Sequence, residues 1–163
     1  WDGFYGPHRA AQDPLHNDDC IYTPGVVVFK ADSDQPKLMK EADWQTLDVI
    51  TCAAPNLRLK PANVMNPGDG AKKIKITDKE LMELHVKRMR RILDIAVQNG
   101  VEVMILGAFG CGAFENSPEV VARAMKTVVE EYRDTFQIME FAVYCSPRDD
   151  TNYKVFSRVL GGR

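Results

Sequence analysis

The residues best placed for chemistry lie in the stretch "VMILGAFGCGAFENSPEVV", which runs from Val103 to Val121. Gly107, Gly110 and Gly112 fall between a predicted strand and a predicted helix, where they remove side chains from the path to backbone N–H groups. Ligands of α/β folds usually bind at the carboxyl ends of strands, and a helix start adds partial positive charge. The spacing therefore favours an anion site, most naturally one for a phosphate.

The loop lacks the residues of the common nucleotide-binding motifs. No Lys-Ser or Lys-Thr follows its last glycine, and the spaced acidic residue of a dinucleotide-binding turn is missing. Phe109 and Phe114 flank the glycines, and we expect one ring in the core and the other over a ribose or base. A second interpretation stays open, in which the glycines only make a tight turn and let the helix pack closely.

The segments around this loop predict an α/β protein. Strands are expected in "CIYTPGVVVFKAD", "LDVITCAAPN", "VEVMIL" and "IMEFAVYCS". The first is interrupted by Pro24 and Gly25, which is typical of a sheet edge, and the second is apolar from Val49 to Ala54, which suits a strand covered on both faces. The first twenty residues mix Gly, Pro, Asp and aromatics, so they are predicted as loop with room for one helical turn.

Three helices are expected. In "TDKE", Thr77 and Glu80 have the spacing of a capping box, and Gly100 is placed to end the helix that follows. Its apolar stripe is Met82, Val86, Met89, Leu93 and Ala96. The second helix starts at "NSPEVV", capped by Asn116 or Ser117, and its stripe is Val121, Ala124, Met125, Val128 and Tyr132. A third, short helix is expected in "DTNYKVFSRVL".

The order of these elements predicts one domain over residues 1–163, with a mixed, largely parallel sheet and helices on both faces. Lys plus Arg (21) nearly balances Asp plus Glu (23), so no overall field attracts nucleic acid or an anionic membrane. We therefore expect no direct DNA binding and no membrane association. The expected location is cytoplasmic.

The cysteines and histidines do not form a metal-binding pattern. There is no CxxC pair, and the spacing of Cys20, Cys52, Cys111 and Cys145 with His8, His16 and His85 fits no metal site. We expect reduced thiols, mostly buried in strands, rather than a disulfide or zinc set. No metal and no cofactor are expected.

Three of the quoted motifs also carry a family resemblance. "GAFGCGAFENSPEVVA", "IYTPGVVVF" and "DVITCAAPN" closely resemble the bacterial-type poly(ADP-ribose) glycohydrolase family, whose members contain a macrodomain. These typically show a G-A-[WF]-G-C-G-x-F loop, an I-Y-S-P-x-V-x-V-F strand and an A-A-P-N turn. The resemblance runs from "FYGPHR" at Phe4 to "NYKVF" ending at Phe156. It implies a three-layer αβα macrodomain-like fold.

The resemblance also implies a site for ADP-ribose or an ADP-ribosylated protein. Its backbone amides would cradle the diphosphate along Gly107, Ala108, Phe109, Gly110, Cys111, Gly112, Ala113 and Phe114. Phe114 would pack against a ribose, Pro55 and Asn56 would line the pocket wall, and Asn152 and Phe156 would sit near the adenine end. Two plainer alternatives stay open, in which Asn56 closes a turn and Phe156 belongs to the core.

The sequence departs from the family where the reaction is catalysed. Members carry a GGG-x(6–8)-QEE loop, whose second Glu is understood to protonate the departing ribose oxygen, and neither GGG nor QEE occurs here. Gln12 and Asp13 are rejected as a degenerate copy, because they follow the "FYGPHR" stretch and Pro14 comes directly after them. We therefore assign no catalytic residue and expect the catalytic segment upstream of Trp1.

A sheet incomplete at its amino-terminal side would expose strand edges, which favours self-association or a partner fragment.

Three functions stay open: part of a hydrolase of ribose–ribose bonds in ADP-ribose polymers, a non-catalytic ADP-ribose-binding module, and a degenerate interaction domain. Under the first two, a Gly110→Glu substitution is expected to block the phosphate and abolish binding.

Overall fold

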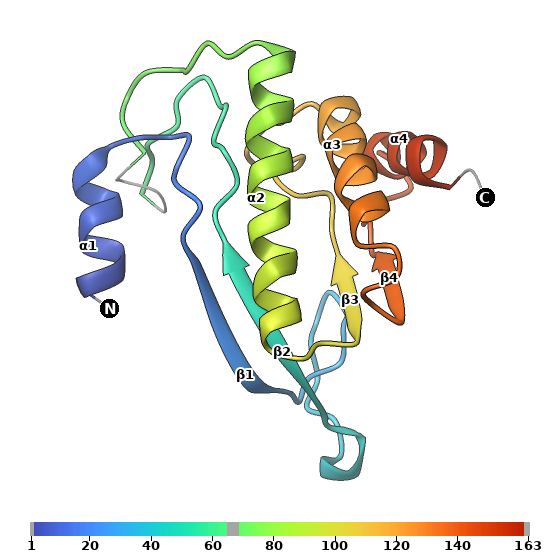
Figure 1. Ribbon diagram of the computed structural model, residues 1–163. Helices are drawn as coiled ribbons and strands as arrows, with labels where there is room; N and C mark the ends of the chain where they lie inside the picture. Colours follow the sequence, from blue (N-terminus) through green and yellow to red (C-terminus); the bar gives the residue numbers. More distant parts are fainter. Residues whose placement is uncertain (1, 65–68, 162–163) are drawn as a thin grey trace. The chain divides into compact units, whose positions relative to one another are not determined.

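The structure is a computed structural model that describes residues 2–64 and 69–161 (Figure 1). The chain divides into two compact units, one formed by Asp19–Cys52 and the other by Trp1–Asp18 together with Ala53–Arg163. Each unit is described by itself, and the expected single domain over residues 1–163 stays a prediction. In the part of the chain that is described, no helix has both the length and the apolar character needed to cross a membrane.

The smaller unit is an antiparallel hairpin. It consists of β1 (Cys20–Val28) and β2 (Gln45–Cys52), with the short 3-10 helix η1 (Glu41–Asp43) in the connection (Figure 1). The second predicted strand is present as β2, but the prediction that it is covered on both faces is wrong. The strand ends at Cys52, and its residues are exposed or half-buried. An antiparallel pair needs cover on one face only, so the continuous apolar run reflects strand propensity rather than a buried layer.

An irregularity in the hairpin follows the predicted interruption of the first strand. The register shifts between Thr23 and Val26, and Gly25 there has a φ of 67°. The Gly25 N–H donates to Asp48 Oδ1 at 2.8 Å, and the Tyr22 hydroxyl donates to the other oxygen of the same carboxylate. One carboxylate thus satisfies the backbone donor that the bulge removes from the ladder.

The larger unit contains four helices and a pair of parallel strands. The helices are α1 (Asp2–Ala11), α2 (Asp78–Gln98), α3 (Pro118–Glu131) and α4 (Thr151–Leu160). The strands are β3 (Val103–Leu106) and β4 (Ile138–Phe141), with Val103 opposite Ile138. Within this unit α3 lies between α2 and α4 (Figure 1). The predicted α/β class is confirmed, and all the expected helices and strands are present.

The prediction of loop for the first twenty residues is wrong over α1. This helix forms although it contains Gly3, Gly6 and Pro7, which are poor helix formers. The Phe4 ring lies 4.9 Å from His8, one turn further along, and 5.0 Å from Tyr5. The contact of Phe4 with His8, four residues further along, is of the kind that stabilises a helix that its intrinsic propensities disfavour.

Helix α2 begins and ends as predicted. The Thr77 N–H donates to Glu80 Oε2 at 2.9 Å, the Glu80 N–H donates to Thr77 Oγ1 at 3.2 Å, and Gly100 has a φ of 67° just after the helix. The buried face differs from the predicted stripe, because it also includes His85 and Arg88. The remaining buried residues are Leu81, Met89, Ile92, Leu93, Ile95 and Ala96, while Met82 and Val86 are only half-buried.

The parallel strands have one buried and one exposed face. Met104 and Leu106 are buried, while Val103, Ile105 and Ile138 are 48%, 67% and 54% exposed. Parallel strands are normally covered on both faces, and this apolar surface, called here the open strand face, is exposed among the described residues of its own unit. The described residues form two separate two-stranded sheets, one antiparallel and one parallel, rather than one continuous sheet.

Candidate functional site

The glycine run joins β3 to α3, as predicted, and folds into consecutive tight turns over residues 107–117. The Phe109 N–H donates to the Gly107 carbonyl at 2.9 Å, and the Cys111 N–H donates to the Ala108 carbonyl at 3.0 Å. The loop is therefore ordered by its own backbone before any ligand is considered.

Asn116 is the buried anchor of this loop. Its side-chain Nδ2 group donates to the carbonyls of Pro55 at 2.7 Å, Gly110 at 3.0 Å and Phe114 at 3.2 Å, and its Oδ1 lies 2.9 Å from His85 Nε2. One amide thus holds two ends of the loop against the segment after β2. The Pro55 carbonyl is buried and needs a donor, and the half-buried Gly110 and Phe114 carbonyls each gain a second donor, so this side chain ties the loop to Pro55.

The expected cap of α3 is therefore only partly right. Ser117 occupies the N-cap position but makes no side-chain cap hydrogen bond, and Pro118 is the first helical residue. Asn116 lies immediately before Ser117, and its side-chain amide contacts the loop instead of the helix start. Of the two residues predicted for the cap, Ser117 has the position without the hydrogen bond, and Asn116 is not the cap.

His85 is held in its neutral form. Burial lowers its pKa below the ordinary histidine value, more than the hydrogen bond with Asn116 raises it. Because the Asn116 amide nitrogen faces three carbonyls, its oxygen faces His85, and the imidazole must carry its proton on Nε2. The Phe109 ring meets this imidazole edge-on, with ring centroids 5.9 Å apart.

Gly110 is a glycine because the fold requires it. Its φ is 77°, and a Cβ there would lie 2.8 Å from both the Ala54 Cβ and Asn116 Nδ2. Any side chain at this position would therefore disturb the anchor as well as strain the backbone. The predicted Gly110→Glu test is thus unsuitable, since loss of binding would follow from damage to the loop alone.

At position 112, neither the backbone conformation nor a close contact within the described residues requires a glycine. Gly112 is exposed, its φ lies outside the left-handed region, and a Cβ there would meet no atom within 4 Å. The N–H groups of Gly112, Ala113 and Phe114 have no hydrogen-bond acceptor among residues 2–64 and 69–161. Three successive donors are thus presented beside an open position, close to the start of α3.

The two phenylalanines both pack against histidines. Phe109 contacts His85, as described, and the Phe114 ring centroid lies 6.2 Å from that of His16. Both rings are half-buried rather than one buried and one open. The expected contact of Phe114 with a ribose stays a prediction.

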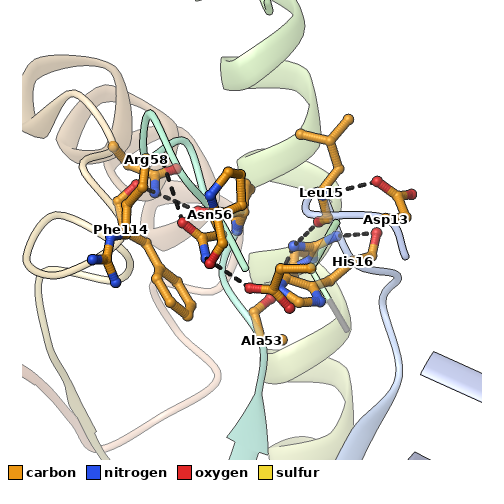
Figure 2. A network of polar contacts seen from close by, with 12 residues as sticks. Asp13, Leu15, His16, Ala53, Asn56, Arg58 and Phe114 are labelled. Atoms are coloured by element: carbon orange, nitrogen blue, oxygen red, sulfur yellow. Dashed lines mark hydrogen bonds and ion pairs between the residues drawn. The ribbon is translucent and has the colours of Figure 1, made fainter. Parts of the chain in front are cut away.

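Asn56 is fully buried and fastens three segments. Its backbone N–H donates to the Pro14 carbonyl at 2.7 Å, and its Nδ2 donates to Asp69 Oδ2 at 2.6 Å. Its Oδ1 accepts the Arg58 N–H at 3.3 Å, a turn that matches the plainer alternative (Figure 2). Pro55 is buried as well, so a role of these two residues in the pocket wall is one of support from behind and stays a prediction.

His16 and Asp69 lie beside Asn56 and were not singled out by the sequence. His16 Nε2 is 3.7 Å from Asp69 Oδ2, and this buried nitrogen has no hydrogen-bond partner within the described residues. Burial lowers the pKa of His16, while the Asp69 carboxylate raises it by a smaller amount. Asp69 is itself buried, and its hydrogen bond from Asn56 keeps it turned into the protein.

Arg88 holds this region from α2. Its guanidinium donates to Asp18 Oδ1 at 3.2 Å and to the carbonyls of Leu15 at 3.1 Å, Ala53 at 2.9 Å and His16 at 3.3 Å. The residue is 1% exposed, so a charge is buried here with four acceptor contacts for its five N–H groups. Figure 2 shows three of these acceptor residues, Leu15, His16 and Ala53, in the same region as Asn56.

The two predicted adenine-side residues lie one turn apart on α4, but they differ in burial. Asn152 Nδ2 lies 3.5 Å from the Cys111 carbonyl, so it adjoins the glycine loop. Phe156 is 2% exposed, with its ring centroid 6.2 Å from that of Phe141, which fits the plainer alternative of a core residue, and its place near an adenine stays a prediction. Burial raises the pKa of Cys111 to about 12, so this residue contributes a neutral thiol and its backbone.

The anchored glycine loop and the α/β elements around it define a macrodomain-like protein. Neither a protein-family model nor a curated protein matches the sequence. Solved structures do match, among them poly(ADP-ribose) glycohydrolase from Deinococcus radiodurans in complex with ADP-ribose. It is 26% identical, has a TM-score of 0.79, and the match covers 98% of this chain and 59% of that one.

The corresponding glycohydrolase from Thermomonospora curvata is 27% identical with a TM-score of 0.80, over 97% of this chain and 53% of that one. Its complex with the inhibitor ADP-HPD is 28% identical with a TM-score of 0.79, over 96% and 54%. The resemblance to bacterial-type poly(ADP-ribose) glycohydrolases is thus confirmed over nearly the whole chain. The chain spans little more than half the length of the solved structures it matches.

Proposed function

We propose that this chain binds ADP-ribose, and that the diphosphate is received by the loop from Gly107 to Phe114. The observation that carries the proposal is the open position at Gly112 beside three backbone donors that the described chain leaves unused. A diphosphate is a dense set of hydrogen-bond acceptors, and successive N–H groups near a helix start suit it. Similar structures were solved with ADP-ribose and with ADP-HPD, which supports this choice of anion.

The loop is suited to this role because it is held in place beforehand. Asn116, His85 and Gly110 form a buried set of contacts on its inner side, so a ligand would not have to order the backbone. A binding site that is already ordered loses less conformational entropy on association. The net charge of −2 offers no long-range attraction, so recognition would depend on these local donors.

The test is calorimetric titration of ADP-ribose into the wild-type chain and three variants. Gly112→Glu places a carboxylate beside the proposed diphosphate and should weaken binding at least about tenfold, equivalent to roughly 1.4 kcal/mol. Gly112→Gln has the same size without the charge and should lose less. Gly3→Glu adds the same charge at another open glycine, on α1, and should bind like wild type.

A folded wild-type chain that does not bind, or a Gly112→Glu variant that binds like Gly3→Glu, would refute the proposed site. Circular dichroism of all four chains shows whether each remains folded. Because a Cβ at Gly112 meets no atom within 4 Å, the substitution itself is not expected to disturb the loop.

A second candidate is hydrolysis of ribose–ribose bonds in ADP-ribose polymers, which the resemblance to glycohydrolases favours. This reaction needs a carboxylic acid at the departing ribose oxygen. Asp13 uses Oδ1 to accept the Leu15 N–H at 2.9 Å, and Asp69 is buried against Asn56. Neither is therefore offered as the acid, and the proposal for this chain is binding, of free ADP-ribose or of an ADP-ribosylated protein.

Incubation with ADP-ribose polymer, followed by chromatography of released ADP-ribose, distinguishes the two candidates. Binding without release would support a recognition module, and release would require a search for the acid. A degenerate interaction domain would neither bind nor hydrolyse. The cytoplasmic location and the lack of DNA binding stay predictions.

The open strand face supports a further part of this proposal, which is association with a second polypeptide. Val103, Ile105 and Ile138 form an apolar surface that a second copy or a partner fragment would cover. Light scattering of the wild type and an Ile105→Lys variant would test it. A monomer in both samples, without a second polypeptide on a gel, would contradict it.

A further inference from the structure

The hairpin places two cysteines opposite each other. Cys20 is the first residue of β1 and Cys52 is the last residue of β2, and the two are direct partners in the antiparallel register. Directly opposite residues of an antiparallel pair project from the same face, with Cα atoms about 4.5 to 5.5 Å apart. A disulfide spans Cα separations of about 4.4 to 6.8 Å.

We propose that Cys20 and Cys52 form a reversible cross-strand disulfide, made by exchange with a small disulfide oxidant such as oxidised glutathione. This inference is independent of ADP-ribose binding. Both side chains are half-buried, so they are accessible to a small reagent without lying on an open surface.

The register that aligns these cysteines is well supported. It runs without interruption from Cys20 opposite Cys52 to Thr23 opposite Val49, and the bulge lies beyond that stretch. The contacts of Asp48 with Gly25 and Tyr22 hold the bulge in place. The strand ladder therefore keeps the two thiols side by side, although they are far apart in the sequence.

The other two cysteines provide matched comparisons. Cys145 is exposed and lies after β4, and Cys111 lies in the glycine loop. Neither has a cysteine opposite it in the strand register of the described residues. Reaction at these positions would therefore stop at a mixed disulfide with the reagent.

The exchange proceeds in two balanced steps. The thiolate of one cysteine attacks a sulfur of the oxidant, which forms a mixed disulfide and releases one small thiol. The thiolate of the second cysteine then attacks the protein sulfur of the mixed disulfide, and the S–S bond between Cys20 and Cys52 forms as the second small thiol leaves. Two electrons pass from the cysteines to the oxidant, and the two cysteine protons end on the released thiols.

Because both cysteines are half-buried, the disulfide stays accessible to a reducing thiol and can be opened again by the reverse exchange. It would close a loop over the whole hairpin, and constraining a loop of this size in the unfolded chain should raise Tm by roughly 5 to 10 °C. Reduction should return Tm to its starting value. The cross-link would thus act as a reversible brace at the end of the hairpin where its chain enters and leaves.

The experiment treats the whole chain with oxidised glutathione and maps the disulfides by mass spectrometry after thiol blocking. We expect a linked peptide containing Cys20 and Cys52 in the wild type and in Cys145→Ser, together with the rise in Tm. Cys20→Ser and Cys52→Ser should give only mixed disulfides and no rise. A wild type in which Cys20 and Cys52 carry only glutathione, or are linked to other cysteines, would overturn the proposal.

Discussion

The inner and outer sides of the glycine loop differ in how their polar groups are used. On the inner side, the Asn116 amide contacts three carbonyls and a histidine, and Gly110 leaves no room for a side chain. On the outer side, Gly112 faces open space, and the donors from there to Phe114 have no acceptor in the described chain. One loop therefore combines a part that the fold requires with a part that is available to a ligand.

The largest expected effect on the inner side of the loop is that of a substitution at Asn116. Asn116→Ala leaves the buried Pro55 carbonyl and His85 without this partner and removes one of the two donors to the Gly110 and Phe114 carbonyls, so we expect a loss of about 3 to 5 kcal/mol in the free energy of unfolding. Urea denaturation measures this loss. Ser117→Ala is the control, because this N-cap makes no side-chain cap hydrogen bond and should lose little. A similar, small loss in both variants would contradict the anchoring role.

The two glycines should respond differently to one added methyl group. Gly110→Ala should cost about 2 to 3 kcal/mol of stability, since it combines a left-handed φ with close contacts to Ala54 and Asn116. Gly112→Ala should change stability by less than about 0.5 kcal/mol, because nothing lies nearby. Equal losses in the two variants, measured by thermal unfolding, would remove the distinction between the two sides.

The inner side should also be sensitive to acid. Because burial lowers the pKa of His85 in the folded chain, the unfolded chain binds the proton more readily. The contribution of the neutral histidine to the free energy of unfolding is fully present above about pH 6.5 and is lost as the pH falls below it, by about 1.4 kcal/mol for each unit by which the pKa is lowered. His85→Gln keeps a donor for Asn116 without titrating, so its stability should fall less steeply, and an unchanged slope would contradict this role. His16, whose pKa is lowered as well, accounts for a remaining slope.

The smallest effect is expected at Arg58, where a substitution tests ligand binding at the outer side of the loop. Its neighbour Leu57 donates from the backbone to the Phe114 carbonyl at 2.9 Å, so the arginine lies close to the proposed diphosphate site. Arg58→Gln should weaken ADP-ribose binding about two- to fivefold, as expected for one partly exposed charge. Arg91→Gln, an exposed arginine on α2, should leave binding unchanged, and equal behaviour of the two variants would contradict the placement.

Local signals in the sequence were sufficient for much of this fold. The capping box of Thr77 and Glu80 was predictable because both partners lie within one helical turn. The glycine loop was placed correctly for the same reason, between an apolar strand and a proline-marked helix start. Helix α1 was missed because its stabilising ring contacts oppose the poor propensities of its glycines and proline.

The buried polar residues were not predictable in this way. Arg88 and His85 are ordinary residues of an amphipathic helix until their acceptors arrive from residues 15–18, Ala53 and Asn116. Gly110 and Gly112 are identical in the sequence, and only the packing around each separates their roles. The alignment of Cys20 with Cys52 likewise depends on the strand register, which spacing along the chain does not reveal.

The contacts of Arg88 also bear on how this protein tolerates change in its length. Asp18 and Ala53, the residues that flank the hairpin unit in the sequence, are both held by the one guanidinium. The chain therefore leaves the larger unit and returns to it at nearly the same place. Segments with such closely spaced ends can be lengthened, shortened or exchanged with little effect on the rest of a protein. By this criterion the hairpin unit is an insertion in the sequence of the larger unit, and it can be exchanged for another segment.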